Sequence, residues 1–146
     1  MQHTANYNLP QWEAGDRIKR ADFNGAMSAI DAALAGAARI VTVTYTGDGA
    51  TSRIISLGFT PRAVIVSTHI SAFDLHVPTT GDVVHYGGIA IGSTYYLGGN
   101  EPAVKIVDGG FQVSRSDSDA VITGTSGHHK SRTNMADTAY SYLAIA

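Results

Sequence analysis

The chain has 146 residues, of which 44% are hydrophobic and 15% are charged, and its formal net charge at pH 7 is −2. This length fits one domain of ordinary size with a small appendage, and low charge combined with 16 glycines favours turn-rich β structure over disorder. The ten lysines and arginines are scattered along the chain, so no electrostatic surface for nucleic acid is expected.

Cysteine is absent, which excludes disulfides and thiolate metal sites and leaves packing or oligomerisation to stabilise the fold. No apolar run approaches the ~20 residues of a membrane-spanning helix. The N-terminal residues lack a basic segment followed by an apolar run, so a secretory signal is not expected. These patterns predict a protein that is made in the cytoplasm and does not insert into a membrane.

Residues 1–38 are predicted to form an extended arm followed by one short helix. Pro10 and several Asn and Gln residues favour extended structure over residues 1–15. Asp22 is the expected N-cap of a helix that runs to Leu34, because its carboxylate can accept hydrogen bonds from the free amides of the first turn. From Arg39 onward the composition changes, so a boundary is expected between residues 38 and 39.

Four apolar side chains of this helix recur at spacings of four, three and four residues, which places them on one face. They are Phe23, Met27, Ile30 and Leu34. An isolated helix of ~12 residues is marginal in water, so this stripe needs a partner. Two surfaces could cover the stripe. One is the β domain of the same chain, and the other is the same helix in other copies, which would make these four residues a trimerisation contact.

In residues 39–146 the hydrophobic period is two. Val41, Val43 and Tyr45 alternate with threonines, which predicts a half-buried strand, and the continuous apolar run Ala63–Thr68 predicts a central strand buried on both faces. Further strands are expected over residues 52–57, 83–91, 103–107, 110–115 and 139–145. Such strands, with turns at short intervals and no helical stretch among them, favour an antiparallel β-sandwich.

The expected fold class is therefore mainly β: an antiparallel β-sandwich preceded by an extended arm and one short N-terminal α-helix. Residues 69–82 and 116–137 are expected to form long polar loops, with a glycine-rich tip around Tyr95 and Tyr96 between them in sequence. Because loops on a rigid scaffold often carry binding residues, we expect these three segments to gather at the end of the sandwich distal to the helix.

Several short motifs resemble bacteriophage and prophage tail proteins. In the N-terminal segment they are Tyr7-Asn8-Leu9-Pro10-Gln11-Trp12, Asp16-Arg17-Ile18, Asp22-Phe23-Asn24 and Ile30-Asp31. Four later motifs resemble the C-terminal domain of phage tail fibres and receptor-binding proteins, a group similar in plan to the trimeric H-type lectin sandwich. They are Tyr45-Thr46-Gly47-Asp48-Gly49, Ile55-Ser56-Leu57-Gly58-Phe59-Thr60-Pro61-Arg62-Ala63-Val64, Gly110-Phe111-Gln112-Val113 and Tyr140-Ser141-Tyr142-Leu143-Ala144.

This resemblance implies a homotrimer in the tail of a virion, assembled in the cytoplasm of a host bacterium. Residues 1–38 would then serve trimerisation and attachment to other tail proteins, and residues 39–146 would bind a bacterial surface glycan or protein receptor. Residues 69–102 and 116–137 match no motif of the family, so the resemblance implies host-range loops whose ligand it does not name. Two alternatives stay open: a structural tail or baseplate component that binds only virion proteins, and a free-standing lectin.

The sequence contains no catalytic motif that we recognise, so neither an enzyme nor a cofactor is expected. A Gly-x-Ser-x-Gly nucleophile elbow is absent. The only glutamates are Glu13 and Glu101, and the neighbouring Asp117 and Asp119 lie in a Ser/Asp-rich loop, which is a poor basis for the paired carboxylates of glycoside hydrolysis.

No metal site is expected either. His128 and His129 are adjacent, and adjacent side chains of a strand point to opposite faces, so one chain cannot easily chelate an ion with both. One histidine from each of three copies could still converge on an ion at a trimer axis. Asp117, Asp119 and Asn134 could offer oxygen atoms to Ca²⁺, although such residues in turns are more often solvated.

Binding of a glycan or a cell-surface protein calls for flat aromatic rings beside planar polar groups. The candidates in the predicted loops are Tyr86, Tyr95, Tyr96, Asn100, Asp74, His128, Arg132 and Asn134. If the tip around Tyr95 and Tyr96 is a strand, one of these two rings must face inward and belong to the core.

Overall fold

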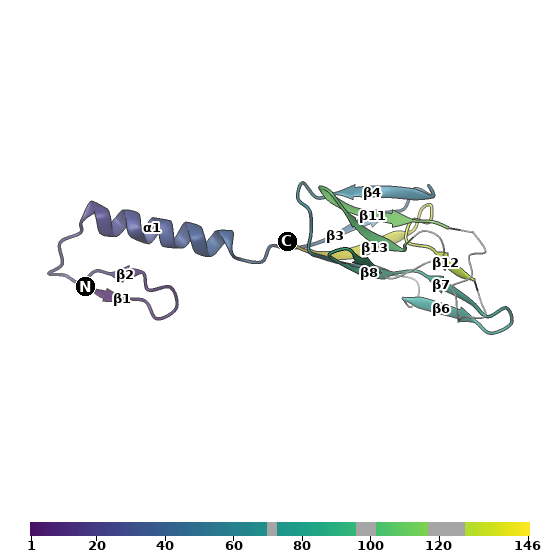
Figure 1. The fold of residues 1–146 in the computed structure, drawn as a ribbon, viewed down its shortest axis with the longest axis horizontal. Helices are drawn as coiled ribbons and strands as arrows, with labels where there is room; N and C mark the ends of the chain where they lie inside the picture. Colours follow the sequence, from purple (N-terminus) through teal and green to yellow (C-terminus); the bar gives the residue numbers. More distant parts are fainter. Residues whose placement is uncertain (70–72, 96–101, 117–127) are drawn as a thin grey trace. The chain divides into compact units, whose positions relative to one another are not determined.

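The computed structural model describes residues 1–69, 73–95, 102–116 and 128–146, and it divides into two compact units, residues 1–38 and 39–146 (Figure 1). Within these ranges the chain is mainly β, with one α-helix in the first unit and three sheets in the second. The expected fold class is confirmed. No helix of the described part is long and apolar enough to cross a membrane.

The first unit consists of a short hairpin and a helix. Strands β1 (Gln2–His3) and β2 (Pro10–Gln11) pair antiparallel, and helix α1 spans Arg20–Ala35. The hairpin is closed by the N–H of Leu9, which donates to the hydroxyl of Thr4 at 3.0 Å. The arm expected over residues 1–15 is therefore folded back on itself over much of its length.

Helix α1 begins two residues earlier than the predicted Asp22 cap. Lys19 occupies the N-cap position without a side-chain hydrogen bond, and Asp22 lies in the first turn. The reason is that Arg20 and Ala21 are good helix formers, so they extend the helix. The carboxylate of Asp22 still interacts favourably with the positive end of the helix dipole.

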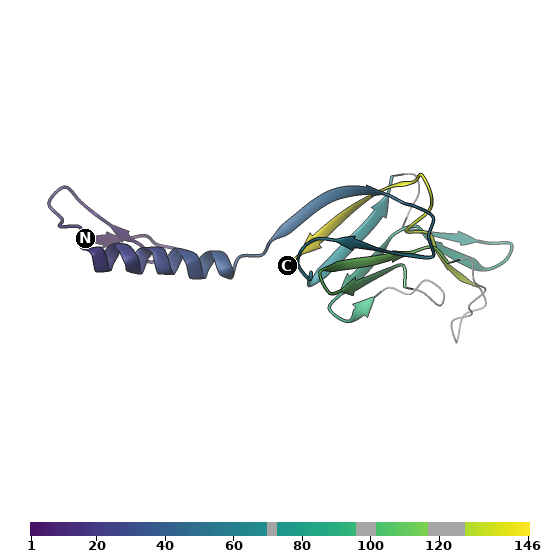
Figure 2. The same cartoon turned by 90° about the horizontal axis from the view of Figure 1, so that it is seen from above.

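The second unit is built around a five-stranded antiparallel sheet in the order β3-β13-β5-β8-β9 (Figures 1 and 2). Its strands are β3 (Ile40–Thr46), β13 (Ala139–Ile145), β5 (Ala63–Thr68), β8 (Gly88–Ile91) and β9 (Thr94–Tyr95). A second antiparallel sheet contains β10 (Val104–Val107), β11 (Gly110–Ser114) and β4 (Ser52–Ser56). A third contains β12 (His129–Ser131), β7 (Asp82–His85) and β6 (Asp74–Val77), and here β12 pairs parallel with β7.

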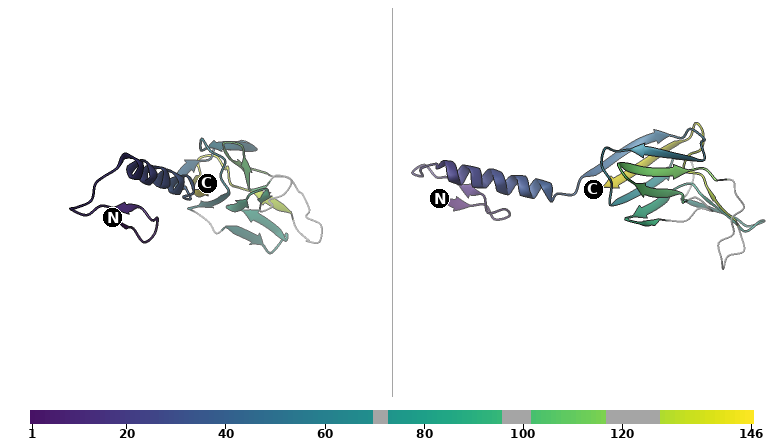
Figure 3. Two further views of the ribbon diagram at one scale, coloured as in Figure 1. Left: turned by 60° about the vertical axis from the view of Figure 1, so that its left-hand side comes forward. Right: turned by 45° about the horizontal axis from the view of Figure 1, so that its top comes forward.

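The core lies between the first two sheets, which stack as the layers of a sandwich (Figure 3). Phe111 of the second sheet meets the ring of Tyr142 edge-on, with 4.9 Å between centroids, and Tyr45 stacks on Tyr140 at 5.0 Å. The predicted strand β5 buries only one face: Val64 and Val66 are fully buried, but Ile65 is 39% exposed. The expectation that β5 is buried on both faces is therefore wrong for the single chain.

Two buried tyrosines anchor the segment that precedes β13. The hydroxyl of Tyr45 donates to the carbonyl oxygen of Thr133, and the hydroxyl of Tyr140 donates to that of Arg132, both at 2.5 Å. The side chain of Thr133 is itself fully buried and donates to the carbonyl oxygen of Ala103. These contacts join the end of β12 to the aromatic core.

Asn134 ties the same segment to the turn after β3. Its Nδ2 donates to Oδ1 of Asp48 at 2.6 Å and to the carbonyl oxygen of Ala50 at 3.0 Å, and the side chain is fully buried. The turn approaches so closely that a Cβ atom on Gly47 would lie 2.0 Å from the carbonyl oxygen of Met135. This buried, internally bonded side chain corrects the expectation that Asn134 contacts a ligand.

Replacing Asn134 with Ala should destabilise the second unit by roughly 1–3 kcal/mol, because the turn after β3 loses its hydrogen bonds to this fully buried side chain. Urea unfolding followed by far-UV circular dichroism measures the change. Ser56→Ala, at an exposed position of β4, is the control and should stay within ~0.5 kcal/mol of wild type. Equal unfolding midpoints for the two variants would contradict the anchoring role.

Candidate binding site

The third sheet lies at the end of the second unit opposite the C-terminus (Figure 1). At the C-terminal end, the N–H of Ala146 donates to the carbonyl oxygen of Arg39 at 2.9 Å, so the chain enters the unit beside its own C-terminus. The third sheet thus occupies the end remote from this entry point. Ends of a rigid sheet scaffold are favoured positions for binding residues.

Two of the predicted loops meet in this sheet. Residues 69–82 contain β6 and residues 116–137 contain β12, and β7 lies between these two strands. Residues 69–82, predicted to be a long connection with at most short extended pieces, contain the four-residue strand β6. The expectation that residues 116–137 are loop throughout is corrected, because β12 pairs with β7 there. Tyr95 lies instead in β9, at the edge of the five-stranded sheet.

Strand register assigns the side chains of the third sheet to two faces, because successive residues of a strand point to opposite sides. One face carries Asp74, His76, Val83, His85, His129 and Ser131. The other, which we call the Leu75 face, carries Leu75, Val77, Asp82, Val84, Lys130 and, just before β12, His128. The tandem histidines therefore lie on opposite faces, as their adjacency predicts.

A chain of hydrogen bonds runs through the first face. His85, which is 1% exposed, has its Nδ1 2.7 Å from Oδ1 of Asp74 and its Nε2 2.9 Å from Nδ1 of His129. Because a carboxylate only accepts, Nδ1 of His85 carries the proton of the contact with Asp74. The direction of the hydrogen bond between His85 and His129 follows from the tautomers of the two rings.

The Leu75 face combines apolar and charged groups. Nδ1 of His128 lies 3.0 Å from Oδ1 of Asp82, and Nζ of Lys130 lies 3.6 Å from Oδ2. The hydrogen bond from the backbone N–H of His128 contributes most to lowering the pKa of Asp82 below its ordinary value. Leu75, about half exposed, shares this face. The arrangement offers a ligand an aliphatic surface beside an ionised, hydrogen-bonding carboxylate.

The other candidate residues lie in different places. Tyr86 follows β7, is half-buried, and donates through its backbone N–H to the carbonyl oxygen of Phe73 at 2.7 Å. Tyr95 is exposed, in register with the buried Ala90, so it lies on the inward side of an edge strand. Tyr96 and Asn100 lie outside the described residues, as do Asp117 and Asp119.

Arg132 is held by backbone groups. Its Nη1 donates to the carbonyl oxygens of Ser116 at 2.6 Å and Ser131 at 3.1 Å, and its own N–H donates to the carbonyl oxygen of His85 at 2.8 Å. The guanidinium thus bridges the end of β12 and the chain beyond β11. Arg132, predicted as a ligand-binding loop residue, therefore also has a structural role.

Sequence reasoning missed two central residues of this sheet, His85 and Asp82. His85 ends a short apolar strand, and its partners Asp74 and His129 are 11 and 44 residues away in the chain. No spacing rule connects residues at such separations. The two β-branched residues Val83 and Val84 between Asp82 and His85 indicate a strand without indicating its neighbours.

Within the described ranges, no group of three or more His, Asp or Glu side chains is arranged to hold a metal ion. Comparison with protein-family models, curated proteins and solved structures finds no match for this chain. The site is therefore interpreted from the chemistry of its own residues, of which the histidine chain and the Leu75 face are the two most ordered features.

The histidine chain predicts a loss of stability in mild acid. Burial, followed by the neighbouring His85 ring, lowers the pKa of His129 below its ordinary value of 6.5. The unfolded chain therefore takes up this proton first, so the stabilisation is complete above pH 6.5 and is lost as the pH falls through the folded-state pKa. Denaturant unfolding from about pH 8 to about pH 5 measures the slope.

His129→Gln should flatten this pH dependence, because the variant lacks the group that titrates. His76→Gln, at an exposed position on β6, should keep the wild-type slope. If His129→Gln loses stability with acid as steeply as wild type, the pH dependence originates elsewhere.

Proposed function

We propose that this chain is the receptor-binding subunit of a bacteriophage or prophage tail and adheres to the surface of a host bacterium as a homotrimer. The observation that carries the proposal is a helix with an exposed apolar stripe attached to a β domain that closes a core of its own. The order of the tail-protein motifs along the sequence supports it. The proposal includes no catalytic step and no cofactor.

The stripe on α1 needs a partner. Phe23, Met27 and Leu34 are each at least half exposed, and α1 has no buried residue. Burying one such side chain completely is worth ~1.5–3 kcal/mol relative to leaving it exposed. Three copies of α1 with their stripes facing one another would cover these residues with a/d packing, as in a short coiled coil.

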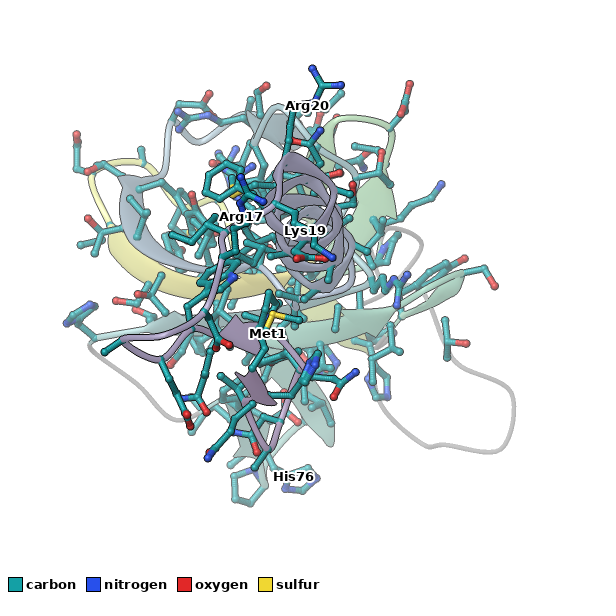
Figure 4. The ribbon with its side chains drawn as sticks, turned by 90° about the vertical axis from the view of Figure 1, so that its left-hand side faces the viewer. Met1, Arg17, Lys19, Arg20 and His76 are labelled. Atoms are coloured by element: carbon teal, nitrogen blue, oxygen red, sulfur yellow. The ribbon has the colours of Figure 1, made fainter. Side chains whose placement is uncertain are left out.

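A basic cluster marks the start of α1. Arg17, Lys19 and Arg20 gather around this end of the helix (Figure 4). In the described part of the chain, no ion pair involves any of the three. We assign this end of the first unit to contact with an acidic surface of another tail protein, since complementary charge steers and orients such contacts.

The Leu75 face is the proposed receptor contact. Asp82 can accept hydrogen bonds from the hydroxyl groups of a glycan or the amides of a protein, and Leu75 can pack against the apolar side of a sugar ring or peptide. Single contacts of this size are weak. Three copies in one trimer would act together through their effective concentration, which suits adhesion to a surface that repeats its receptor.

Ile30→Asp should weaken or abolish the trimer, because it places an unpaired charge at a buried contact in each of three copies. Light scattering at micromolar concentration gives the mass. Ser28→Asp adds the same charge to an exposed position away from the stripe and should leave the mass unchanged. A wild-type chain that is monomeric under these conditions would contradict the proposed self-association.

Leu75→Ser combined with His128→Ala should reduce adsorption to host cells by about tenfold or more, because each trimer loses three contacts at once. Flow cytometry with labelled protein measures adsorption. Lys105→Ala with Gln112→Ser, on the outer side of the second sheet, is the control and should adsorb like wild type. Changes at the exposed Leu75 and Lys105 usually cost under ~0.5 kcal/mol, and melting temperatures check that the changes at the partly buried His128 and Gln112 leave the domain folded.

The remaining outcomes separate the alternatives. Undiminished adsorption by the Leu75 and His128 double variant would place the receptor contact elsewhere. A wild-type protein that adsorbs to no bacterium but is recovered with virions would favour a structural tail or baseplate component. A protein that binds glycans but never associates with virions would favour a free-standing lectin.

A further inference from the structure

The outer face of the five-stranded sheet is apolar, although it lies on the side away from the core. Strand register places six large aliphatic side chains there. They are Ile40, Ile65, Ile89, Ile91, Leu143 and Ile145, and we call this surface the isoleucine face. Ile91 is 61% exposed and Ile65, near the centre, is 39% exposed.

These side chains form two continuous rows across four strands. The register joins Ile40, Ile145, Ala63 and Ile91 in one row, and Thr42, Leu143, Ile65 and Ile89 in the next. A hollow of about 440 Å³ lies over β3, β13 and β5, with Ile65 and Leu143 in its lining. Strand β5 thus has the uninterrupted apolar pattern of a strand buried on both faces, yet only its inner face is covered within the chain.

The isoleucine face carries no Asp, Glu, Lys or Arg among the side chains that β3, β13, β5 and β8 direct to it. Its remaining residues are Thr, Ser and Ala. The outer side of the second sheet differs, because Lys105, Gln112 and Ile54 form one row there. The outer side of the second sheet is therefore suited to solvent, and the isoleucine face is suited to contact with another apolar surface.

The area fits an assembly that uses both units of the chain. Four strands ~4.8 Å apart, each about six residues long at ~3.3 Å per residue, cover on the order of 400 Å² in projection. A 16-residue helix is ~24 Å long and, with a contact strip about 10 Å wide, adds roughly 240 Å². One side of a standard protein interface buries about 800 Å² of accessible surface, which is more than the projected area of either surface alone.

We propose that the isoleucine face is buried against the isoleucine faces of neighbouring copies of this chain. An uncharged face is compatible with itself, because identical copies bring no like charges together. An anionic membrane or a nucleic acid would instead be met by cations, which this face lacks. The inference rests on the proposed homotrimer and extends its contact from α1 to the β domain.

The absence of cysteine allows a test by single thiols in the full chain. Ile91→Cys and Ile54→Cys replace the same residue at 61% and 60% exposure in the single chain, one on the isoleucine face and one on the outer side of the second sheet. In the trimer, Ile91→Cys should react with a maleimide about tenfold or more slowly than Ile54→Cys. A short bismaleimide should join chains through Ile65→Cys but not through Ile54→Cys.

Two charge variants test the same face through the association of the chains. Ile91→Asp should raise the concentration at which the trimer dissociates by about tenfold or more, whereas Ile54→Asp should leave it unchanged. Sedimentation equilibrium measures the dissociation, and circular dichroism checks that both variants are folded.

The outcomes distinguish this inference from the proposed function. A trimer that persists with equal labelling at positions 54 and 91, and that only Ile30→Asp dissociates, would overturn the isoleucine-face contact and leave the helix contact standing. A monomeric wild-type chain would overturn both. A monomer that binds neutral lipid vesicles through Ile91 would assign the face to a different occupant and would also overturn the inference.

Discussion

The second unit depends on the packing of β13 (Ala139–Ile145), which pairs with β3 on one side and β5 on the other. Tyr140 and Tyr142 on its inner side are buried in the aromatic core, while Leu143 and Ile145 point to the opposite side. A central strand with large apolar side chains on both sides requires a cover on each. The second sheet supplies one cover, and the proposed contact with neighbouring copies would supply the other.

Tyr140 also links this core to the candidate binding end. Its ring packs in the core while its hydroxyl holds the carbonyl oxygen of Arg132, at the end of β12. Strands β12 and β7 carry the histidine chain on one face and the Leu75 face on the other. The face that carries His129, whose pKa is lowered chiefly by burial, is therefore on the opposite side of the same strands from the proposed receptor contact.

Several elements follow from local patterns alone. The alternation around Tyr45 predicts β3, the apolar run Ala63–Thr68 predicts β5, and the spacing of the stripe predicts α1 to within two residues at its start. These predictions succeed because hydrophobic period is a property of neighbouring residues. Of the candidate ligand contacts, His128 lies on the proposed binding surface, whereas Asn134 is buried and bonded within the fold. Polar residues of a loop look the same in sequence in either role.

By itself, the sequence determined the mainly β class of the chain, the single helix and the apolar character of the helix stripe and of β5. Only the tertiary structure decided that β12 pairs parallel with β7, and that Asp74, His85 and His129 form one chain of hydrogen bonds. It also decided which face of β5 is left open at Ile65. The physical reason is that the hydrophobic period depends on neighbouring residues and indicates only which side chains favour burial. The surface that buries them is set by contacts between segments far apart in the chain.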